Sequence, residues 1–295
     1  MYKTIHLKDI NIREVQNFLN YAVAPRPICF ASTIDLSGNV NLSPFSYFNL
    51  FSFKPPILIF STLRRVRNNT TKNTLQNILE VPEVAINIVD YKMVQQVSLS
   101  SCEYPKGTDE FIKSGFTKEP SSLIKPPRVK ESSVQMECKV LEVKSLGNEG
   151  GSGQLIICEV ILMHIDTNVL DENGKMNQKK INHIARLGGN WYAQISEDNL
   201  FEVEKPNTEL GIGFDQLPQS IRNSKILTGN HLGQLANSKE MPEINPAFDD
   251  IKLKNIFQYF STDPFELERE LHLYAKELLN EGNIYEAWQV LLAMA

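Results

Sequence analysis

The hydrophobic pattern of the chain changes twice, and each change predicts a different kind of structure. Near the N-terminus, Asn11 and Glu14 form a capping-box-like pair. Apolar residues then recur at helical spacing until Pro25, which predicts a short N-terminal helix. From Arg26 to Ser61, short β-rich runs alternate with turn residues, which predicts a meander of antiparallel strands.

The middle of the chain predicts further strands with only a few helices between them. The expected elements are helices at 70–80 and 90–99 and strands at 84–89, 133–146 and 154–166, the last two joined as a hairpin by a glycine-rich turn. The first helix carries Leu75, Ile78 and Leu79 on one face. The segment 102–130 has no sustained periodicity, so we expect a long irregular loop of the kind that often carries function. Many strands at short spacing favour a closed or split β-barrel, which we expect to end near Tyr192.

Beyond about residue 200 the strand pattern disappears, and two helices are predicted at 263–279 and 284–294. Their apolar stripe can pack onto the chain's own barrel or a dimer mate, or it can dock a partner protein. The stripe consists of Leu267, Leu271, Tyr274, Leu278 and Leu279. From the turn-rich segment 214–233 we infer no activity. We therefore expect a mainly β fold with helices, made of a barrel domain at 1–198 and a helical C-terminal extension at 199–295.

Composition and charge remove several classes of function. Hydrophobic residues make up 42% of the chain and charged residues 22%, which is typical of a globular protein and not of a disordered one. The net charge of -5 and the lack of long Lys/Arg blocks argue against nucleic acid as a partner. No apolar run approaches the roughly 20 residues that span a membrane. Four dispersed cysteines and an N-terminus without a signal-peptide pattern predict a cytoplasmic protein.

Two neighbouring segments have the residue types that hold a phosphate group. Ser61, Thr62 and Arg64 end a predicted strand, and the segment 72–74, which contains Lys72, Asn73 and Thr74, opens the next helix. A dianion is stabilised by helix N-terminal N–H groups, hydroxyl donors and cations, all of which this pair supplies. A solvated loop followed by a capped helix explains the same composition without a ligand.

The strand at 41–49 mixes hydroxyl and amide side chains with aromatic rings. A flat heteroaromatic ring with polar edges needs such an apolar wall with hydrogen-bonding groups, although an aromatic strand is also typical of a core. The candidate residues are Asn41, Ser43, Pro44, Phe45, Ser46 and Asn49. Farther along, Arg186 precedes two glycines that permit a close backbone approach, or that form an ordinary turn.

Other common types of site are not supported. His164 and His183 have no partner at the spacing of a metal site, and no nucleophile motif of a hydrolase occurs. The glycine clusters at 150–153 and 211–213 do not complete a dinucleotide-binding fingerprint. The sequence thus predicts no metal and assigns no catalytic side chain.

Taken in order, several of these segments resemble the flavin-reductase-like family, in its flavoredoxin-like form. The resemblance covers about residues 21–195. It rests on the segments 24–28 (APRPI), 32–38 (STIDLSG), 41–49 (NLSPFSYFN), 72–78 (KNTLQNI), 109–116 (DEFIKSGF), 127–132 (PRVKES) and 186–192 (RLGGNWY).

This resemblance implies a split barrel that binds flavin mononucleotide (FMN), usually as a homodimer with the flavin near the subunit interface. By position, the phosphate would lie against Ser61, Thr62, Lys72, Asn73 and Thr74, with Arg64 or Arg65 nearby. The ring and ribityl chain would lie along 41–46 and the strand that contains Ser32 and Thr33, with Asn49 and Arg186 as further candidates. Asn73 stands where the family commonly has an aspartate.

The resemblance also implies an activity, the reduction of flavin by NADH or NADPH, in which hydride transfer requires no protein acid or base. The reduced flavin would serve a partner oxygenase or an electron-transfer protein. Two alternatives stay open: a non-enzymatic FMN electron carrier, and a flavin-dependent oxidase of a small molecule.

Overall fold

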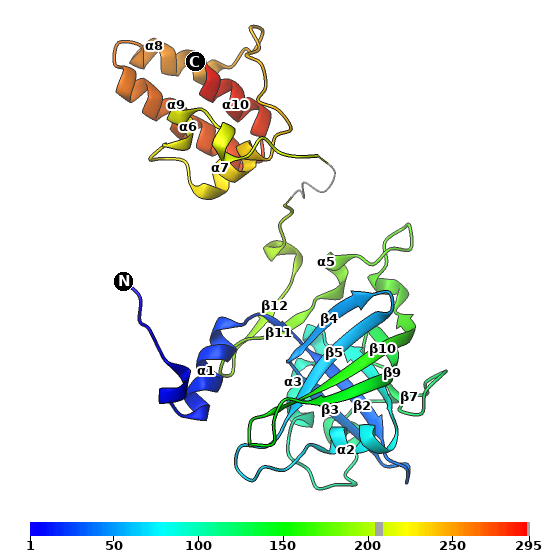
Figure 1. The fold of residues 1–295 in the computed structure, drawn as a ribbon. Coiled ribbons are helices and arrows are strands. Elements are labelled where there is room, and N and C mark those ends of the chain that lie inside the picture. Colours follow the sequence, from blue (N-terminus) through cyan, green and yellow to red (C-terminus); the bar gives the residue numbers. More distant parts are fainter. Residues whose placement is uncertain (204–208, 294–295) are drawn as a thin grey trace. The chain divides into compact units, whose positions relative to one another are not determined.

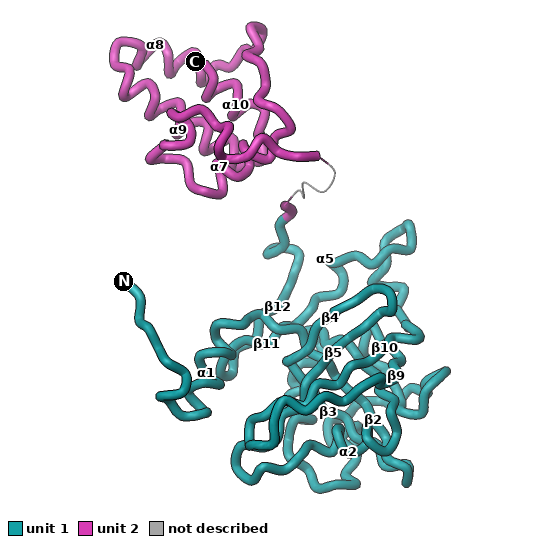
Figure 2. The backbone as a smooth tube through the Cα atoms, viewed as in Figure 1, with its two compact units in different colours: residues 1–201 teal, residues 202–295 magenta. Residues whose placement is uncertain are grey.

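The structure is a computed structural model that describes residues 1–203 and 209–293. The chain forms two compact units, residues 1–201 and 202–295 (Figure 2). Each unit has its own hydrophobic core, and the two are described separately below. That residues 1–198 and 199–295 are two separate domains stays a prediction.

Unit 1 is built on an antiparallel sheet in the order β3-β2-β6-β9-β10-β5-β4 (Figure 1). Its strands are β2 (Cys29–Ile34), β3 (Val40–Phe45), β4 (Phe48–Phe53), β5 (Pro56–Leu63), β6 (Glu83–Ile88), β9 (Val134–Ser145) and β10 (Gly153–Ile165). The two long strands β9 and β10 form the predicted hairpin, with register shifts that let the sheet bend.

The sheet curls into a barrel because strands far apart in its order share one apolar cluster. The ring of Phe45 in β3 packs 5.4 Å from the ring of Phe60 in β5. Cys29, Ile86 and Ile156 add side chains from β2, β6 and β10 to the same interior. The expectation of a mainly β, split-barrel architecture is therefore confirmed.

A second apolar cluster covers the outside of β2 and β3, where helices and loops pack. Phe30 and Leu42 point outward to meet Val97 and Phe111. The covering elements are α3 (Val94–Ser100), α4 (Glu110–Ser114) and β8 (Arg128–Val129), which pairs with β7 (Lys118–Glu119). Helix α2 (Asn73–Glu80) instead adds Ile78 to the cluster inside the barrel. A small sheet of β1 (Arg26–Pro27), β11 (Ile184–Arg186) and β12 (Tyr192–Gln194) completes the unit, with α5 (Gln178–Ile181) before it.

The N-terminal helix α1 (Ile12–Ala22) begins at the predicted capping box. The Asn11 side chain accepts from the backbone N–H groups of Arg13 and Glu14, and the Glu14 side chain accepts from the Asn11 N–H. None of the residues of α1 is buried within the chain. Ile12, Phe18 and Leu19 are exposed in the single chain.

Two expectations for unit 1 need correction. The helix predicted at 70–80 begins only at Asn73, and Leu79 is 67% exposed, while Leu75 and Ile78 are buried. The segment 102–130 is not wholly irregular, because it contains α4 and the strand pair β7–β8. Asp109 caps α4 by accepting from the Phe111 N–H, and five helical residues are too few to show a periodic pattern.

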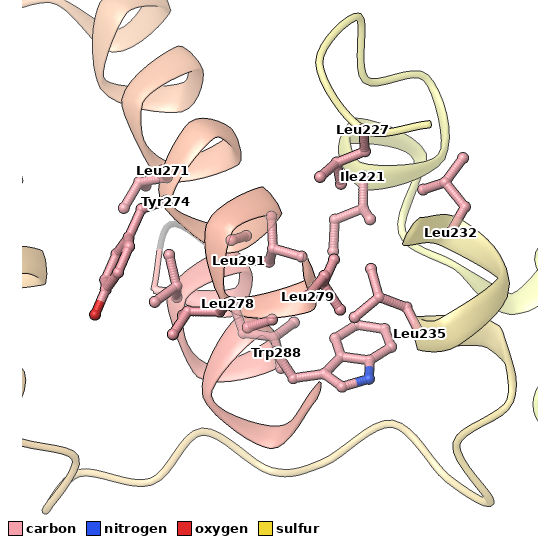
Figure 3. Packing of buried hydrophobic residues seen from close by; sticks show 14 of the residues in the cluster. Ile221, Leu227, Leu232, Leu235, Leu271, Tyr274, Leu278, Leu279, Trp288 and Leu291 are labelled. Atoms are coloured by element: carbon pink, nitrogen blue, oxygen red, sulfur yellow. The ribbon is translucent and has the colours of Figure 1, made fainter. Parts of the chain in front are cut away.

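Unit 2 is helical, and its core explains the apolar stripe of the tail. Helices α9 (Pro264–Asn280) and α10 (Ile284–Leu292) pack against α7 (Gly229–Ala236), as Figure 3 shows for Leu279, Trp288 and Leu235. The stripe residues named above all lie in this cluster. The expectation that they cover the barrel or dock a partner is wrong, since they are buried within their own unit.

Three helices in the described part of this unit were not predicted: α6 (Gln219–Arg222), α7 and α8 (Ile251–Phe260). Helix α7 carries two glycines in eight residues, and α6 has a single turn, so neither gives a clear period. The predicted end of the last helix at Met294 lies outside the described residues. No described helix combines the length and apolar character needed to cross a membrane.

We predict that the two cores unfold separately. Trp288 is 1% exposed in the core of unit 2, so Trp288→Ala should lower the unfolding free energy of this unit by about 3–5 kcal/mol. Calorimetry should then show one transition moving to lower temperature while the other stays in place. Phe60→Ala in the barrel should move the other transition instead. Joint movement of both transitions in either variant would contradict independent folding.

Candidate functional site

A cavity of about 260 Å³ opens where β3, β5, α1 and the β11–β12 turn meet. The side chains around it are polar or aromatic with a few apolar members. They are Gln16, Asn20, Arg26, Ser43, Pro44, Phe45, Ser46, Tyr47, Ser61, Leu63, Lys72, Ser101, Arg186, Leu187 and Gly189. The volume lies just below the roughly 300–1,000 Å³ of typical small-molecule sites, so a larger ligand would be only partly enclosed by one chain.

The cavity is strongly cationic. Arg26, Lys72 and Arg186 all line it, and no aspartate or glutamate does so within the described ranges 1–203 and 209–293. Four serine hydroxyls add neutral donors. Positive charges with hydroxyl donors and without a competing carboxylate favour an anionic ligand.

Arg26 is the most deeply buried of these cations, at 7% exposed. Its Nη1 donates to the carbonyl oxygens of Asn20 and Val23 at 2.8 and 2.7 Å, and its Nη2 donates to that of Leu187 at 3.0 Å. The guanidinium therefore joins the C-terminal end of α1 to the β11–β12 turn. Burial lowers the pKa of Arg26, and no carboxylate among the described residues offsets its charge.

Lys72 stands at the N-cap position of α2 and is half-buried. Its ammonium forms no hydrogen bond or ion pair with any residue in the described part of the chain. Burial, and next the nearby positive charge of Arg65, lower the pKa of Lys72. An anion beside Lys72 would relieve both effects, and the N-terminal end of α2 adds a favourable dipole.

Aromatic side chains hold α1 against the cavity. The Tyr47 hydroxyl donates to Asn20 Oδ1 at 2.8 Å, and the Arg26 guanidinium lies 5.8 Å from the centre of the Tyr47 ring. The ring of Tyr21 covers Gly188 so closely that a Cβ there would stand 2.5 Å from it. The first glycine after Leu187 thus permits the approach of α1, whereas Gly189 lines the cavity.

A buried hydrogen-bond chain fixes the strand behind the cavity. The Thr74 hydroxyl donates to Asn41 Oδ1 at 2.6 Å, and Asn41 Nδ2 donates to Glu110 Oε1 at 2.9 Å. Glu110 Oε2 accepts from the Leu42 N–H at 3.1 Å. Burial raises the pKa of this Glu110 carboxyl. The chain links α2, β3 and α4, so it sets where the wall at 43–46 stands.

The cavity brings together seven of the fifteen residues that the sequence suggested for a cofactor, namely Ser43, Pro44, Phe45, Ser46, Ser61, Lys72 and Arg186. Thr62 points the other way, because successive strand residues alternate and its neighbours Leu58 and Phe60 face the barrel interior. Asn41 and Thr74 belong to the buried chain described above.

The remaining candidates also lie away from this cavity. Ser32 and Thr33 are buried in β2, and Thr33 accepts from the Asn77 side chain. Arg64 donates to Asn69, and the side chain of Asn49, in β4, accepts from the next N–H. Asn73 lines a separate small hollow beside Asp35. A cofactor role for each of the fifteen residues stays a prediction.

Sequence reasoning missed Arg26, Tyr47 and the polar residues of α1 at 16 and 20. Both lie within segments that the sequence had singled out. Arg26 stands between Pro25 and Pro27, and Tyr47 lies in the aromatic strand at 41–49. The contribution of α1 had no local signal, because it depends on how the helix folds back over the β11–β12 turn.

These donors fit a flavin that carries a phosphate. Lys72, Ser61 and the start of α2 suit a dianion, and Pro44, Phe45 and Tyr47 offer apolar and aromatic surface to a flat ring. Two buried hydroxyls without partners, Ser32 Oγ and Thr62 Oγ1, lie outside the cavity and do not add to this fit.

Comparison with known proteins gives a consistent result. Residues 21–184 match the model of the flavin reductase like domain. A protein of Aquifex aeolicus is 36% identical over 172 residues, which are 58% of this chain and 85% of the relative. Nitrilotriacetate monooxygenase component B from Bacillus cereus has a similar structure, with a TM-score of 0.64, 26% identity, and coverage of 69% of this chain and 99% of that one.

A structure from Shewanella frigidimarina, described as a candidate flavin reductase with a split barrel domain, has a TM-score of 0.58 and 26% identity and covers 68% of this chain and 96% of its own. The chain therefore belongs to the flavin reductase-like family. This confirms the resemblance drawn from the motifs. The family match ends before unit 2 begins.

We predict that Lys72 carries much of the affinity for FMN. Lys72→Gln removes an unpaired, half-buried charge and should weaken FMN binding about ten- to a hundredfold, as expected for one charge-assisted hydrogen bond. Titration of FMN into purified protein, followed by flavin fluorescence, measures the change. Lys139→Gln, on the exposed face of β9, serves as the charge-matched control. Unchanged FMN affinity in the Lys72 variant would contradict the assignment of Lys72 to the phosphate.

Proposed function

We propose that this chain binds FMN in the cationic cavity and works as an NADH- or NADPH-dependent flavin reductase. The observation that carries the proposal is a cavity with three cations, four serines and no lining carboxylate among the described residues, within a flavin reductase-like domain. Such a donor set is suited to a phosphate-bearing ligand.

The residues around the cavity divide into two groups. Lys72 and Ser61 would hold the phosphate, together with N–H groups at the start of α2. The wall at 43–46 and the Tyr47 ring would hold the flat ring system, and Arg186 adds a further cation to the lining. Bound FMN supplies a ring that accepts a hydride from a nicotinamide without a protein acid or base. The tasks of this chain are therefore to bind, to orient and to restrict water.

The proposal includes a homodimer that completes the site. The edge strand β4 exposes Phe51 and Phe53, at 63% and 84%, and α1 exposes Phe18 and Leu19. An exposed apolar edge strand is unusual unless another chain covers it. A second copy would also enclose the part of FMN that a cavity of about 260 Å³ leaves open.

A partner oxygenase fits the same proposal. The similar Bacillus cereus structure is component B of a monooxygenase, and 99% of that chain is covered. A component that supplies reduced flavin to an oxygenase needs an open site from which flavin can leave.

The test is the absorbance spectrum of the purified protein with FMN, followed without oxygen during addition of NADH and then NADPH. We expect flavin bands that either nucleotide bleaches, and the faster one identifies the donor. Bands that persist with both nucleotides would contradict the reductase and favour the electron carrier or the oxidase. Failure to retain any flavin bands after reconstitution would overturn the proposal itself.

A further inference from the structure

The cations around the flavin cavity belong to two separate groups. Lys72 stands at the start of α2, where burial and the nearby charge of Arg65 lower its pKa. Arg26 lies between the end of α1 and the β11–β12 turn, where burial and, more weakly, the nearby charge of Arg186 lower its pKa. The cavity therefore has one positive end at α2 and another at the β11–β12 turn.

Arg26 contacts the part of the wall that would hold the flavin ring. Its Nε donates to Ser46 Oγ at 3.4 Å, and its guanidinium lies 5.8 Å from the centre of the Tyr47 ring. Ser46 and Tyr47 both line the cavity, as does Arg26 itself. A flavin ring held against this wall would therefore have the guanidinium beside it.

The charge of Arg26 is not neutralised by an anion. Its acceptors within residues 1–203 and 209–293 are three carbonyl oxygens and one hydroxyl, which occupy four of its five N–H donors and leave its net charge in place. Because Arg26 is only 7% exposed, solvent screens this charge less than that of a surface arginine.

Arg186 adds a second cation at the same end of the cavity. Its Nη1 donates to the carbonyl oxygen of Trp191 at 3.1 Å, and its Nη2 donates to that of Gly189. The Arg186 guanidinium also lies 4.5 Å from the centre of the Tyr192 ring. Within the part of the chain that the structure describes, no carboxylate pairs with either arginine or lines the cavity.

The two positive ends differ in what they can distinguish. The phosphate of FMN is present whether the ring is oxidised or reduced, so Lys72 attracts both forms. A hydride brings two electrons and one proton to the neutral oxidised ring, while the nicotinamide that loses the hydride becomes a cation. The ring thereby gains one negative charge, and a buried cation beside it stabilises the reduced form over the oxidised one.

We propose that Arg26, together with Arg186, makes this cavity bind reduced FMN more tightly than oxidised FMN. The inference rests on the proposed flavin site and deepens it, because it gives the two positive ends different tasks. Lys72 and Ser61 hold the phosphate in both oxidation states, and the two arginines favour hydride transfer toward the bound ring. Neither arginine acts as an acid or a base, so their effect is on the reduction potential.

The experiment measures the midpoint potential of FMN bound to the full-length protein, titrated with dithionite without oxygen against a reference dye. We expect a potential above that of free FMN. Arg186→Gln should reduce the preference for reduced FMN about tenfold, which lowers the potential by about 30 mV for a two-electron couple. Arg26→Lys, which keeps the charge, should retain more of the preference than Arg26→Gln. If the Arg26 variants fail to retain FMN, Arg186→Gln decides alone.

Control variants separate this effect from phosphate binding. Lys72→Gln should weaken oxidised and reduced FMN by similar factors, so that the potential changes less than in Arg186→Gln, and Lys139→Gln should change neither affinity nor potential. A bound potential at or below that of free FMN, or a wild-type potential in Arg186→Gln, would overturn the inference. Bound FMN that dithionite reduces but NADH and NADPH do not would instead contradict the proposed reductase, and the potentials would still test the two arginines.

Discussion

The contacts of the Arg26 guanidinium with three backbone carbonyls hold the candidate flavin site together. They connect the end of α1, at Asn20 and Val23, to Leu187 in the β11–β12 turn. Neither segment belongs to the barrel sheet, so these contacts, with the packing of Tyr21 on Gly188, set their distance from β3. The Nε of Arg26 also donates to Ser46 Oγ at 3.4 Å. A buried cation satisfied only by carbonyls and a hydroxyl keeps a positive potential that attracts an anion.

A second set of hydrogen bonds fixes the position of the cavity wall. The strand β3 is held from behind by the chain from Thr74 through Asn41 to Glu110, and its front faces the cavity at 43–46. Two residues that the sequence suggested as ligand contacts, Asn41 and Thr74, thus act through this chain. Their contribution to a bound flavin is to position the strand.

Much of the barrel could be predicted because its signals are local. The capping box at Asn11, the hairpin between β9 and β10, and the seven cavity residues all lie in short segments whose pattern is visible in the sequence. Side chains alternate between the two faces of β5, so two neighbouring candidate ligand residues differ: Ser61 faces the cavity and Thr62 does not. The contribution of α1 was missed because it depends on long-range packing.

Unit 2 was harder to predict for a different reason. Its helices α9 and α10 were visible, but of the elements that cover them α6 has only four residues and α7 contains two glycines, and the ten-residue α8 was also missed. The apolar stripe therefore looked unpartnered in the sequence, although α7 and the residues around it bury it.

The central claim is that the cationic cavity recognises the phosphate of a flavin. Calorimetric titration of the full-length protein with FMN and with riboflavin, at low and high salt, tests it most directly. The account predicts that FMN binds at least about tenfold more tightly, and that added salt reduces this advantage. Equal affinity for FMN and riboflavin at low salt would contradict it.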